Sequence, residues 1–119
     1  AGQILQVTQD HSFVGEQLKS GLLSKEGARA HPQRNLLTSA LGLGENPQID
    51  LYRSGTAPGD LYLLCTDGLH AALSDEDLLA ITLSVPDRAL YKIGLSLVLK
   101  ANLAGGRDDT TVILIAFSE

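Results

Sequence analysis

Two segments of the chain are apolar at nearly every position, without the alternation typical of a half-exposed strand. They are residues 61–66 (Leu-Tyr-Leu-Leu-Cys-Thr) and residues 111–117 (Thr-Val-Ile-Leu-Ile-Ala-Phe). Successive strand residues point to opposite faces of a sheet, so this pattern predicts strands that are covered on both faces. Shorter segments at residues 3–7 and 49–54 also predict strands, and residues 36–41 fit either a strand or a loop that leads into one.

Apolar residues at helical spacing, bounded by residues typical of helix ends, predict four helices at about residues 13–21, 24–30, 74–83 and 86–103. Ser74 followed by three acids indicates a capped helix start, not a metal site. Pro86 occupies the first position of the longest predicted helix, where proline is favoured, and two glycines at 105–106 end it. Its expected buried stripe is Leu90, Ile93, Leu97, Val98 and Ala101.

The order of these elements predicts an α+β fold with antiparallel strands. Two helices separate residues 61–66 from residues 111–117, so the end of the first strand meets the start of the second at one sheet edge if the two pair antiparallel. Asp67, Asp108 and Asp109 would then cluster at that edge. Clustered carboxylates repel one another unless they are protonated or bridged by a cation, which favours a hard-metal site.

Simpler interpretations stand beside each candidate. Asp67 precedes a glycine and could be a plain turn residue, Asp10 could cap the helix that begins near Ser12, and Asp108 and Asp109 could cap a strand start. The three histidines lack the mutual spacing of a ligand set and are interpreted as structural or exposed: His11, His31 and His70. Arg34 is expected to form an internal salt bridge or hydrogen bond, and Cys65 to be an inert core thiol.

Composition restricts the class of protein. The chain has 119 residues, 44% of them hydrophobic and 19% charged, enough for one small globular domain. A net charge of −5 argues against a nucleic acid or an anionic membrane surface as partner. No apolar run approaches the ~20 residues of a membrane span, the first residues do not form a signal peptide, and a lone cysteine excludes an internal disulfide or a cysteine-based zinc site. A cytoplasmic protein is expected.

Four segments together resemble one family. Residues 59–69 resemble the motif G-D-x-x-L-L-C-[ST]-D-G-L, and residues 105–112 resemble G-x-x-D-N-x-T-V. Residues 10–12 (Asp-His-Ser) resemble T-x-D-H-S, and residues 31–42 resemble the bacterial segment H-P-x-R-N-x-L-T-x-A-L-G. In family order and spacing, these are motifs of the metal-dependent serine/threonine protein phosphatases of type 2C, the PPM family.

The resemblance implies part of a four-layer α-β-β-α sandwich with antiparallel sheets. It also implies two or three Mn²⁺ or Mg²⁺ ions per intact site, which activate a water for direct hydrolysis of phosphoserine or phosphothreonine in proteins. Asp67 and Asp108 match metal ligands, and Asp10 matches the position of a third, weaker metal to which Asp67 also contributes. Asp109 stands where many members have asparagine. Phosphoprotein substrates, and opposition to a serine/threonine kinase, follow from the same resemblance.

Two features of the family are missing from these residues. The only Asp-Gly pair is at Asp67 and the only Gly-Gly pair is at Gly105, so the D-G-x-G-G motif of the family's N-terminal half is absent, as is that half's phosphate-binding arginine. Residues 1–119 are therefore expected to be the C-terminal portion of a phosphatase domain, inactive alone, with residues 10–44 as the flap beside the active site. The alternative is a non-catalytic fragment or interaction module of the same ancestry. Half a sandwich should also self-associate through exposed strand edges.

Overall fold

The computed structural model describes residues 2–106 and 108–119, and these divide into two compact units. We call Gln6–Arg53 the flap unit, after the role that the sequence suggests for it, and Ser54–Glu119 with the first five residues the sheet unit. Each unit has its own helices and its own buried residues. They are described separately below.

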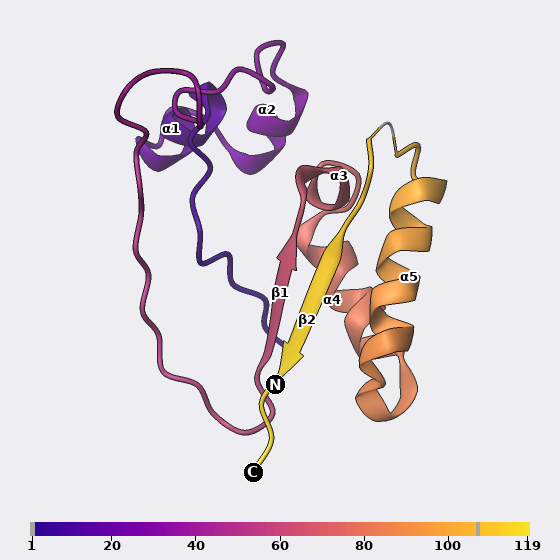
Figure 1. Ribbon diagram of the computed structural model, residues 1–119. Coiled ribbons are helices and arrows are strands. Elements are labelled where there is room, and N and C mark those ends of the chain that lie inside the picture. Colours follow the sequence, from indigo (N-terminus) through magenta and orange to yellow (C-terminus); the bar gives the residue numbers. More distant parts are fainter. Residues whose placement is uncertain (1, 107) are drawn as a thin grey trace. The chain divides into compact units, whose positions relative to one another are not determined.

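The sheet unit contains the two strands that the apolar segments predict. Strands β1 (Leu61–Cys65) and β2 (Val112–Ala116) pair antiparallel, with Leu61 opposite Ala116 and Cys65 opposite Val112. Figure 1 shows the two arrows side by side and in opposite directions. The antiparallel arrangement, and the α+β class that it implies, are confirmed.

Three helices cover one face of this sheet. They are α3 (Asp67–His70), α4 (Asp75–Ser84) and α5 (Leu90–Leu103), and α5 runs alongside β2 (Figure 1). Leu69, Ile93 and Leu97 are fully buried between these helices and the inner face of the sheet. Gly94 of α5 faces β2, and a Cβ added there would meet Val112 Cγ2 at 3.6 Å, an ordinary van der Waals distance. The described part of the chain contains no helix of the length and hydrophobicity that crossing a membrane requires.

Helix α4 begins where the acidic run predicts. Ser74 Oγ accepts a hydrogen bond from the Asp77 backbone N–H at 3.1 Å, and the Asp77 carboxylate accepts one from the Ser74 N–H at 3.1 Å. This reciprocal pair satisfies two backbone donors that the first helical turn leaves without partners. Asp75, Glu76 and Asp77 are therefore a helix start, as expected.

The predicted start of the longest helix at Pro86 is wrong. Pro86–Arg88 forms a separate 3₁₀ turn, η1, and α5 begins only at Leu90. Asp87 and Arg88 both adopt left-handed backbone angles, with φ of 57° and 49°, which no continuous right-handed helix accommodates. The Arg88 guanidinium holds the turn by donating to the Gly59 carbonyl at 2.8 Å.

The late helix start also changes the predicted apolar stripe. Ile93, Leu97 and Ala101 are buried as expected. Leu90 is 38% exposed at the first position of the helix, and Val98 is only half-buried. The buried stripe of α5 therefore consists of Ile93, Leu97 and Ala101 and does not include the first residue of the helix.

The flap unit contains two short helices, α1 (Phe13–Lys19) and α2 (Lys25–Ala30), both predicted. Serine caps each of them: Ser12 Oγ accepts from the Gly15 N–H and Ser24 Oγ from the Gly27 N–H, both at 3.0 Å. Residues 36–41 form a loop with a single antiparallel bridge, between Ser12 and Leu37.

Two predicted strands, at residues 3–7 and 49–54, are not strands in the structure. A strand requires a neighbour to complete its hydrogen bonds, and in the described residues these segments have none. Their apolar side chains stay largely exposed, at 83% for Leu5, 86% for Ile49 and 85% for Leu51. The described residues form one two-stranded sheet and no second sheet of a sandwich.

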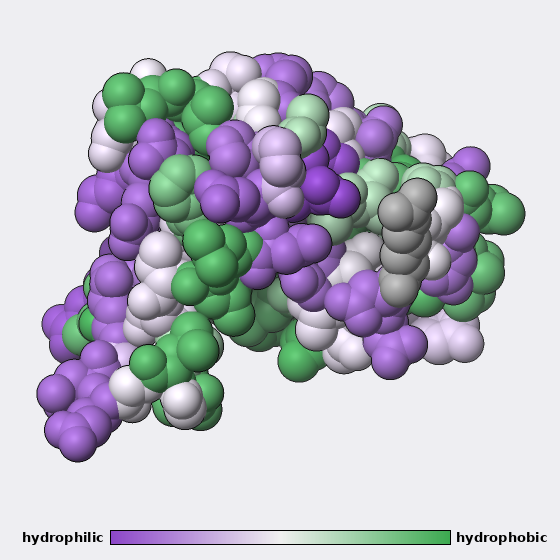
Figure 2. Space-filling view, turned by 90° about the horizontal axis from the view of Figure 1, so that it is seen from above, coloured by the Kyte–Doolittle hydropathy of each residue, from purple (hydrophilic) through white to green (hydrophobic). Residues whose placement is uncertain are grey.

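The sheet is covered on one face only, so the expectation of cover on both faces is not met within the described chain. Alternate residues pack toward the core: Leu61, Leu63, Cys65, Val112 and Leu114. The opposite face carries Leu64, Ile113 and Ile115, and these are about half exposed. We call these three residues the open face. Figure 2 shows hydrophobic residues at several places on the surface in that view.

Candidate functional site

The candidate site lies where β1 ends and the segment before β2 begins. Asp67 is the first residue of α3, directly after β1, and Asp108 lies four residues before β2. The backbone pairing continues past the strands, because the Thr66 N–H donates to the Thr111 carbonyl at 3.1 Å. The structure thus brings the Asp67 and Asp108 segments to the same sheet edge, as the sequence predicted. That the Asp67 and Asp108 carboxylates lie close together stays a prediction.

Gly68 allows the two segments to touch. A Cβ added to Gly68 would lie 2.2 Å from the Asp109 carbonyl oxygen and 3.0 Å from Thr110 Oγ1. Real Cβ atoms do not approach backbone oxygen so closely, so only glycine fits at this position. The glycine after Asp67 is therefore required by close packing against residues 109–110. Asp67 itself begins a helical turn and is not part of a plain reverse turn.

The loop before β2 is held by short-range hydrogen bonds. The Asp109 backbone N–H donates to Asp108 Oδ1 at 2.8 Å, so one oxygen of that carboxylate caps its own loop. The capping interpretation of Asp108 is thus partly realised. Arg107, within the same motif, lies outside the described residues.

We call the place where the Asp67 and Asp108 segments meet at the sheet edge the seam, and its side chains are acidic. Asp67, Asp108 and Asp109 are all exposed, and in the described chain no lysine or arginine forms an ion pair with them. The hydroxyl oxygen of Thr110 is buried beside them, with no hydrogen-bond partner among the described residues. Exposed carboxylates next to an unsatisfied oxygen are the donor chemistry that hard divalent cations prefer.

The same geometry shows that this donor set is incomplete. Residues 2–106 and 108–119 contain no group of three or more His, Cys, Asp or Glu side chains that could hold a metal ion. Hard cations such as Mg²⁺ and Ca²⁺ take about six or more oxygen ligands, some of them water. The residues present fit a divalent cation in chemical type and fall short of a full coordination shell.

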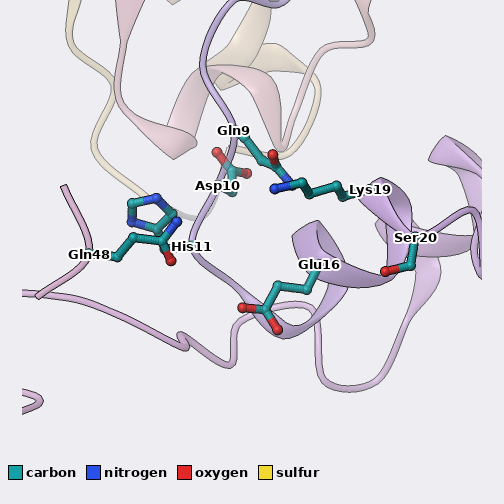
Figure 3. A pocket seen from close by; sticks show the side chains of 7 residues that line it. All are labelled: Gln9, Asp10, His11, Glu16, Lys19, Ser20 and Gln48. Atoms are coloured by element: carbon teal, nitrogen blue, oxygen red, sulfur yellow. The ribbon is translucent and has the colours of Figure 1, made fainter. Parts of the chain in front are cut away.

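Asp10, the third candidate, belongs to the flap unit. It lines an open hollow of about 290 Å³ together with Gln9, His11, Glu16, Lys19, Ser20 and Gln48 (Figure 3). In that view the Lys19 side chain extends toward Gln9 and Asp10. The alternative that Asp10 caps α1 is wrong, because the side chain that accepts at the helix start belongs to Ser12. Asp10 remains an exposed carboxylate.

The flap unit contains a hydrogen-bonded cluster that the sequence did not predict. His11 Nε2 lies 2.7 Å from Asp50 Oδ2, the Tyr52 hydroxyl donates to the same oxygen at 3.0 Å, and Gln48 Nε2 donates to Oδ1 at 3.2 Å. These hydrogen bonds, the one from His11 first, hold the pKa of the Asp50 carboxyl below its usual range. Burial, and then the bond to Asp50, raises the pKa of Tyr52. No sequence spacing links position 11 to position 50.

Three of the other side chains that the sequence singled out have structural roles. The His31 ring packs on Phe13 at a centroid distance of 5.5 Å, and its Nδ1 accepts from the Gln33 N–H at 3.0 Å. Arg34 donates to the His31 carbonyl at 3.3 Å, which matches the expected hydrogen-bond role. Cys65 is half-buried and packs against the core cluster.

Comparisons with known proteins agree with the motifs. No family model matches the sequence. The protein phosphatase PhpP of Streptococcus pneumoniae is 40% identical over 114 residues, which are 96% of this chain and 46% of that protein. The serine/threonine phosphatase Stp1 of Staphylococcus aureus superposes with a TM-score of 0.90 at 31% identity, over 98% of this chain and 45% of that one.

A further solved structure shows the metal content of a relative. The catalytic domain of the serine/threonine protein phosphatase PstP, in complex with two manganese ions, matches 99% of this chain and 47% of its own, with a TM-score of 0.71 and 30% identity. The chain spans about half the length of the curated relatives that it matches. By sequence and by fold, the chain is similar to about half the length of serine/threonine protein phosphatases of the PPM type, or type 2C.

Proposed function

We propose that residues 1–119 are the C-terminal portion of a phosphatase domain which, when complete, hydrolyses phosphoserine and phosphothreonine in proteins. The seam that carries the Asp67 and Asp108 segments supports the proposal most directly. It joins the two motifs at one sheet edge through the Thr66–Thr111 hydrogen bond. The activities named for the relatives favour the same reaction class.

In this proposal Asp67 and Asp108 would hold a divalent cation, Mn²⁺ or Mg²⁺, and Asp10 would contribute to a further, weaker site. The bound cations would neutralise phosphoryl oxygens and lower the pKa of a bound water. The chain's own contribution is to present exposed carboxylates at the seam without a competing ion pair in its described part. The two manganese ions of the PstP relative support a site with more than one metal.

The chain alone should have little activity. Its donor set lacks a third ligand among the described residues, and hydrolysis by paired metals requires both ions to be held ~3.5–4 Å apart. The alternative function is a non-catalytic interaction module of the same ancestry, which the open face and the exposed segments 3–7 and 49–54 favour. The proposal includes phosphoprotein substrates, opposition to a serine/threonine kinase and a cytoplasmic location. The lone cysteine supports that location.

Calorimetric titration with Mn²⁺ tests the metal site. We expect weak binding that Asp67→Asn or Asp108→Asn reduces strongly, because each change removes one charged ligand. Glu76→Gln is the matched control, since it removes an exposed carboxylate from the first turn of α4 in the same unit. Equal binding by Asp67→Asn and the wild-type chain would exclude Asp67 as a ligand.

Hydrolysis of a phosphothreonine peptide tests the activity. The chain is assayed with Mn²⁺, alone and mixed with the complementary half of a relative such as PhpP. We expect turnover only in the mixture, and only with Asp67 intact. Mn²⁺-dependent turnover by the 119-residue chain alone would overturn the claim that it is half of a site. No turnover in a mixture whose halves demonstrably associate would favour the interaction module.

A further inference from the structure

We propose that Thr66 is a positioning residue whose hydroxyl fixes the loop carrying Asp108 and Asp109 against the end of β1. The inference rests on the proposed metal site, and it assigns a role to a side chain that contacts neither metal nor substrate in that proposal.

Thr66 adds hydrogen bonds between the two chain segments just beyond the last residue pair of the sheet. The regular register ends at Cys65 and Val112. Past that point, Thr66 Oγ1 accepts a hydrogen bond from the Thr111 N–H at 3.1 Å, and the Thr66 backbone N–H donates to the Thr111 carbonyl at 3.1 Å. Both main-chain groups of Thr111 are therefore held by Thr66.

The same hydroxyl also reaches the acidic loop. It lies 3.4 Å from the Asp109 carbonyl oxygen, to which it can donate over a distance longer than a usual O–H···O bond. A hydroxyl has one proton and two lone pairs, so donating to Asp109 and accepting from Thr111 are compatible. The shorter bond to Thr111 therefore carries most of the restraint, and the longer one orients Asp109.

Two further contacts transmit this restraint to the carboxylates. Gly68 lies so close to the Asp109 carbonyl that the loop has no room to move inward. The Asp109 N–H donates to Asp108 Oδ1 at 2.8 Å, so the orientation of the Asp109 peptide sets that of the Asp108 carboxylate. Thr66 thus contacts the loop through hydrogen bonds and Gly68 through close packing, and Asp67 lies between them in sequence.

If Thr66 served only to stabilise the backbone of the sheet, it would not need to contact the loop that carries Asp108 and Asp109. Outer-shell partners of metal ligands typically change metal affinity by about 10- to 100-fold when they are removed. Thr66 is exposed, so replacing it with valine removes the hydroxyl at nearly constant volume and leaves the core intact.

The experiment compares four variants of the full 119-residue chain. Thr66→Val removes the hydroxyl, Thr66→Ser retains it, and Thr82→Val is the matched control because the Thr82 hydroxyl donates at 2.7 Å to Leu78 within α4, away from the seam. Thr66→Ala is a second hydroxyl-free variant. Amide hydrogen exchange at Thr111 measures the restraint directly, and Mn²⁺ titration measures its consequence.

We expect Thr66→Val to exchange the Thr111 amide at least about tenfold faster and to bind Mn²⁺ roughly tenfold more weakly. Thr66→Ser should restore both values, and Thr82→Val should change neither. Faster exchange with unchanged Mn²⁺ affinity would reduce Thr66 to a structural residue and overturn the inference. A wild-type chain whose Mn²⁺ binding is unaffected by Asp67→Asn would overturn the proposed metal site and this inference with it.

Discussion

His11 and Asp50, 39 positions apart in the flap unit, form a hydrogen bond of 2.7 Å between Nε2 and Oδ2. Their side chains are only 22% and 28% exposed, and Tyr52 and Gln48 donate to the same carboxylate. The bond therefore ties residues 48–52, which have no strand partner in the described chain, to the segment that precedes α1. This connection carries the first prediction.

The stability of the flap unit should fall in acid. The pKa of Asp50 is depressed in the folded chain, with the hydrogen bond from His11 as the largest cause. A depressed pKa contributes stability that is fully present above the unfolded value of about 3.9 and is lost as pH falls through the lower folded value. Melting curves of wild type and Asp50→Asn should therefore differ at pH 7 and converge once the pH falls below the folded pKa of Asp50. Glu45→Gln, an exposed neighbour, should follow wild type throughout.

Gly68 and Gly94 form a matched pair for a test of the seam. A Cβ on Gly68 would collide with the Asp109 carbonyl at 2.2 Å, whereas one on Gly94 would meet Val112 Cγ2 and Leu114 Cδ1 at ordinary distances of 3.6 and 3.7 Å. Gly68→Ala should destabilise the sheet unit by about 1–3 kcal/mol through overpacking. Gly94→Ala should stabilise it by up to ~1 kcal/mol, because alanine favours the helix. Urea unfolding measures both, and equal stability of the two variants would contradict the close approach at Gly68.

The turn before α5 should tolerate glycine better than its own aspartate. Asp87 has a left-handed φ of 57°, a conformation that costs an L-residue about 1–2 kcal/mol. Glycine avoids most of that cost. About 0.5–1 kcal/mol of this gain is offset because glycine loses more conformational entropy on folding than other residues. Asp87→Gly should thus be neutral or stabilising by about 0.5 kcal/mol in thermal unfolding, and Asp87→Val clearly destabilising. A loss of stability in both variants would show that the Asp87 side chain, not its backbone, matters.

The local signals in the sequence predicted most of the sheet unit because its partners lie within the chain. The apolar segments gave β1 and β2, Ser74 gave the start of α4, and antiparallel pairing placed the Asp67 and Asp108 segments at one edge. The predicted strands at 3–7 and 49–54 are wrong for the opposite reason. A pattern of strand-forming residues shows only that a segment is able to form a strand, and among the described residues neither segment has a neighbouring strand to pair with. Pro86 misled because nothing in the residue types of Asp87 and Arg88 signals two successive left-handed residues.

The carboxylates of the candidate site could be predicted from the sequence, whereas the contacts that hold their segments in place could not. Asp67 and Asp108 stand beside buried strands, so chain topology alone brings their segments together. The hydroxyl of Thr66, the contact at Gly68 and the pairing of His11 with Asp50 depend on distances between segments 39 to 45 positions apart. Such distances follow only from the packed structure.

The open face of the sheet should drive self-association. Leu64, Ile113 and Ile115 expose 51%, 56% and 44% of their surfaces on the side away from the helices. Uncovered apolar surface and open strand edges recruit other chains, so wild type should show dimers or larger species at micromolar concentration in light scattering. The double variant Ile113→Thr, Ile115→Thr keeps β-branched residues in β2 and should shift the population to monomer. Leu99→Thr, which removes an equally exposed apolar side chain from α5, should leave the assembly unchanged. A wild-type chain that stays a compact monomer would show that the open face does not drive association. It would also weaken the interpretation that another chain or segment covers this face.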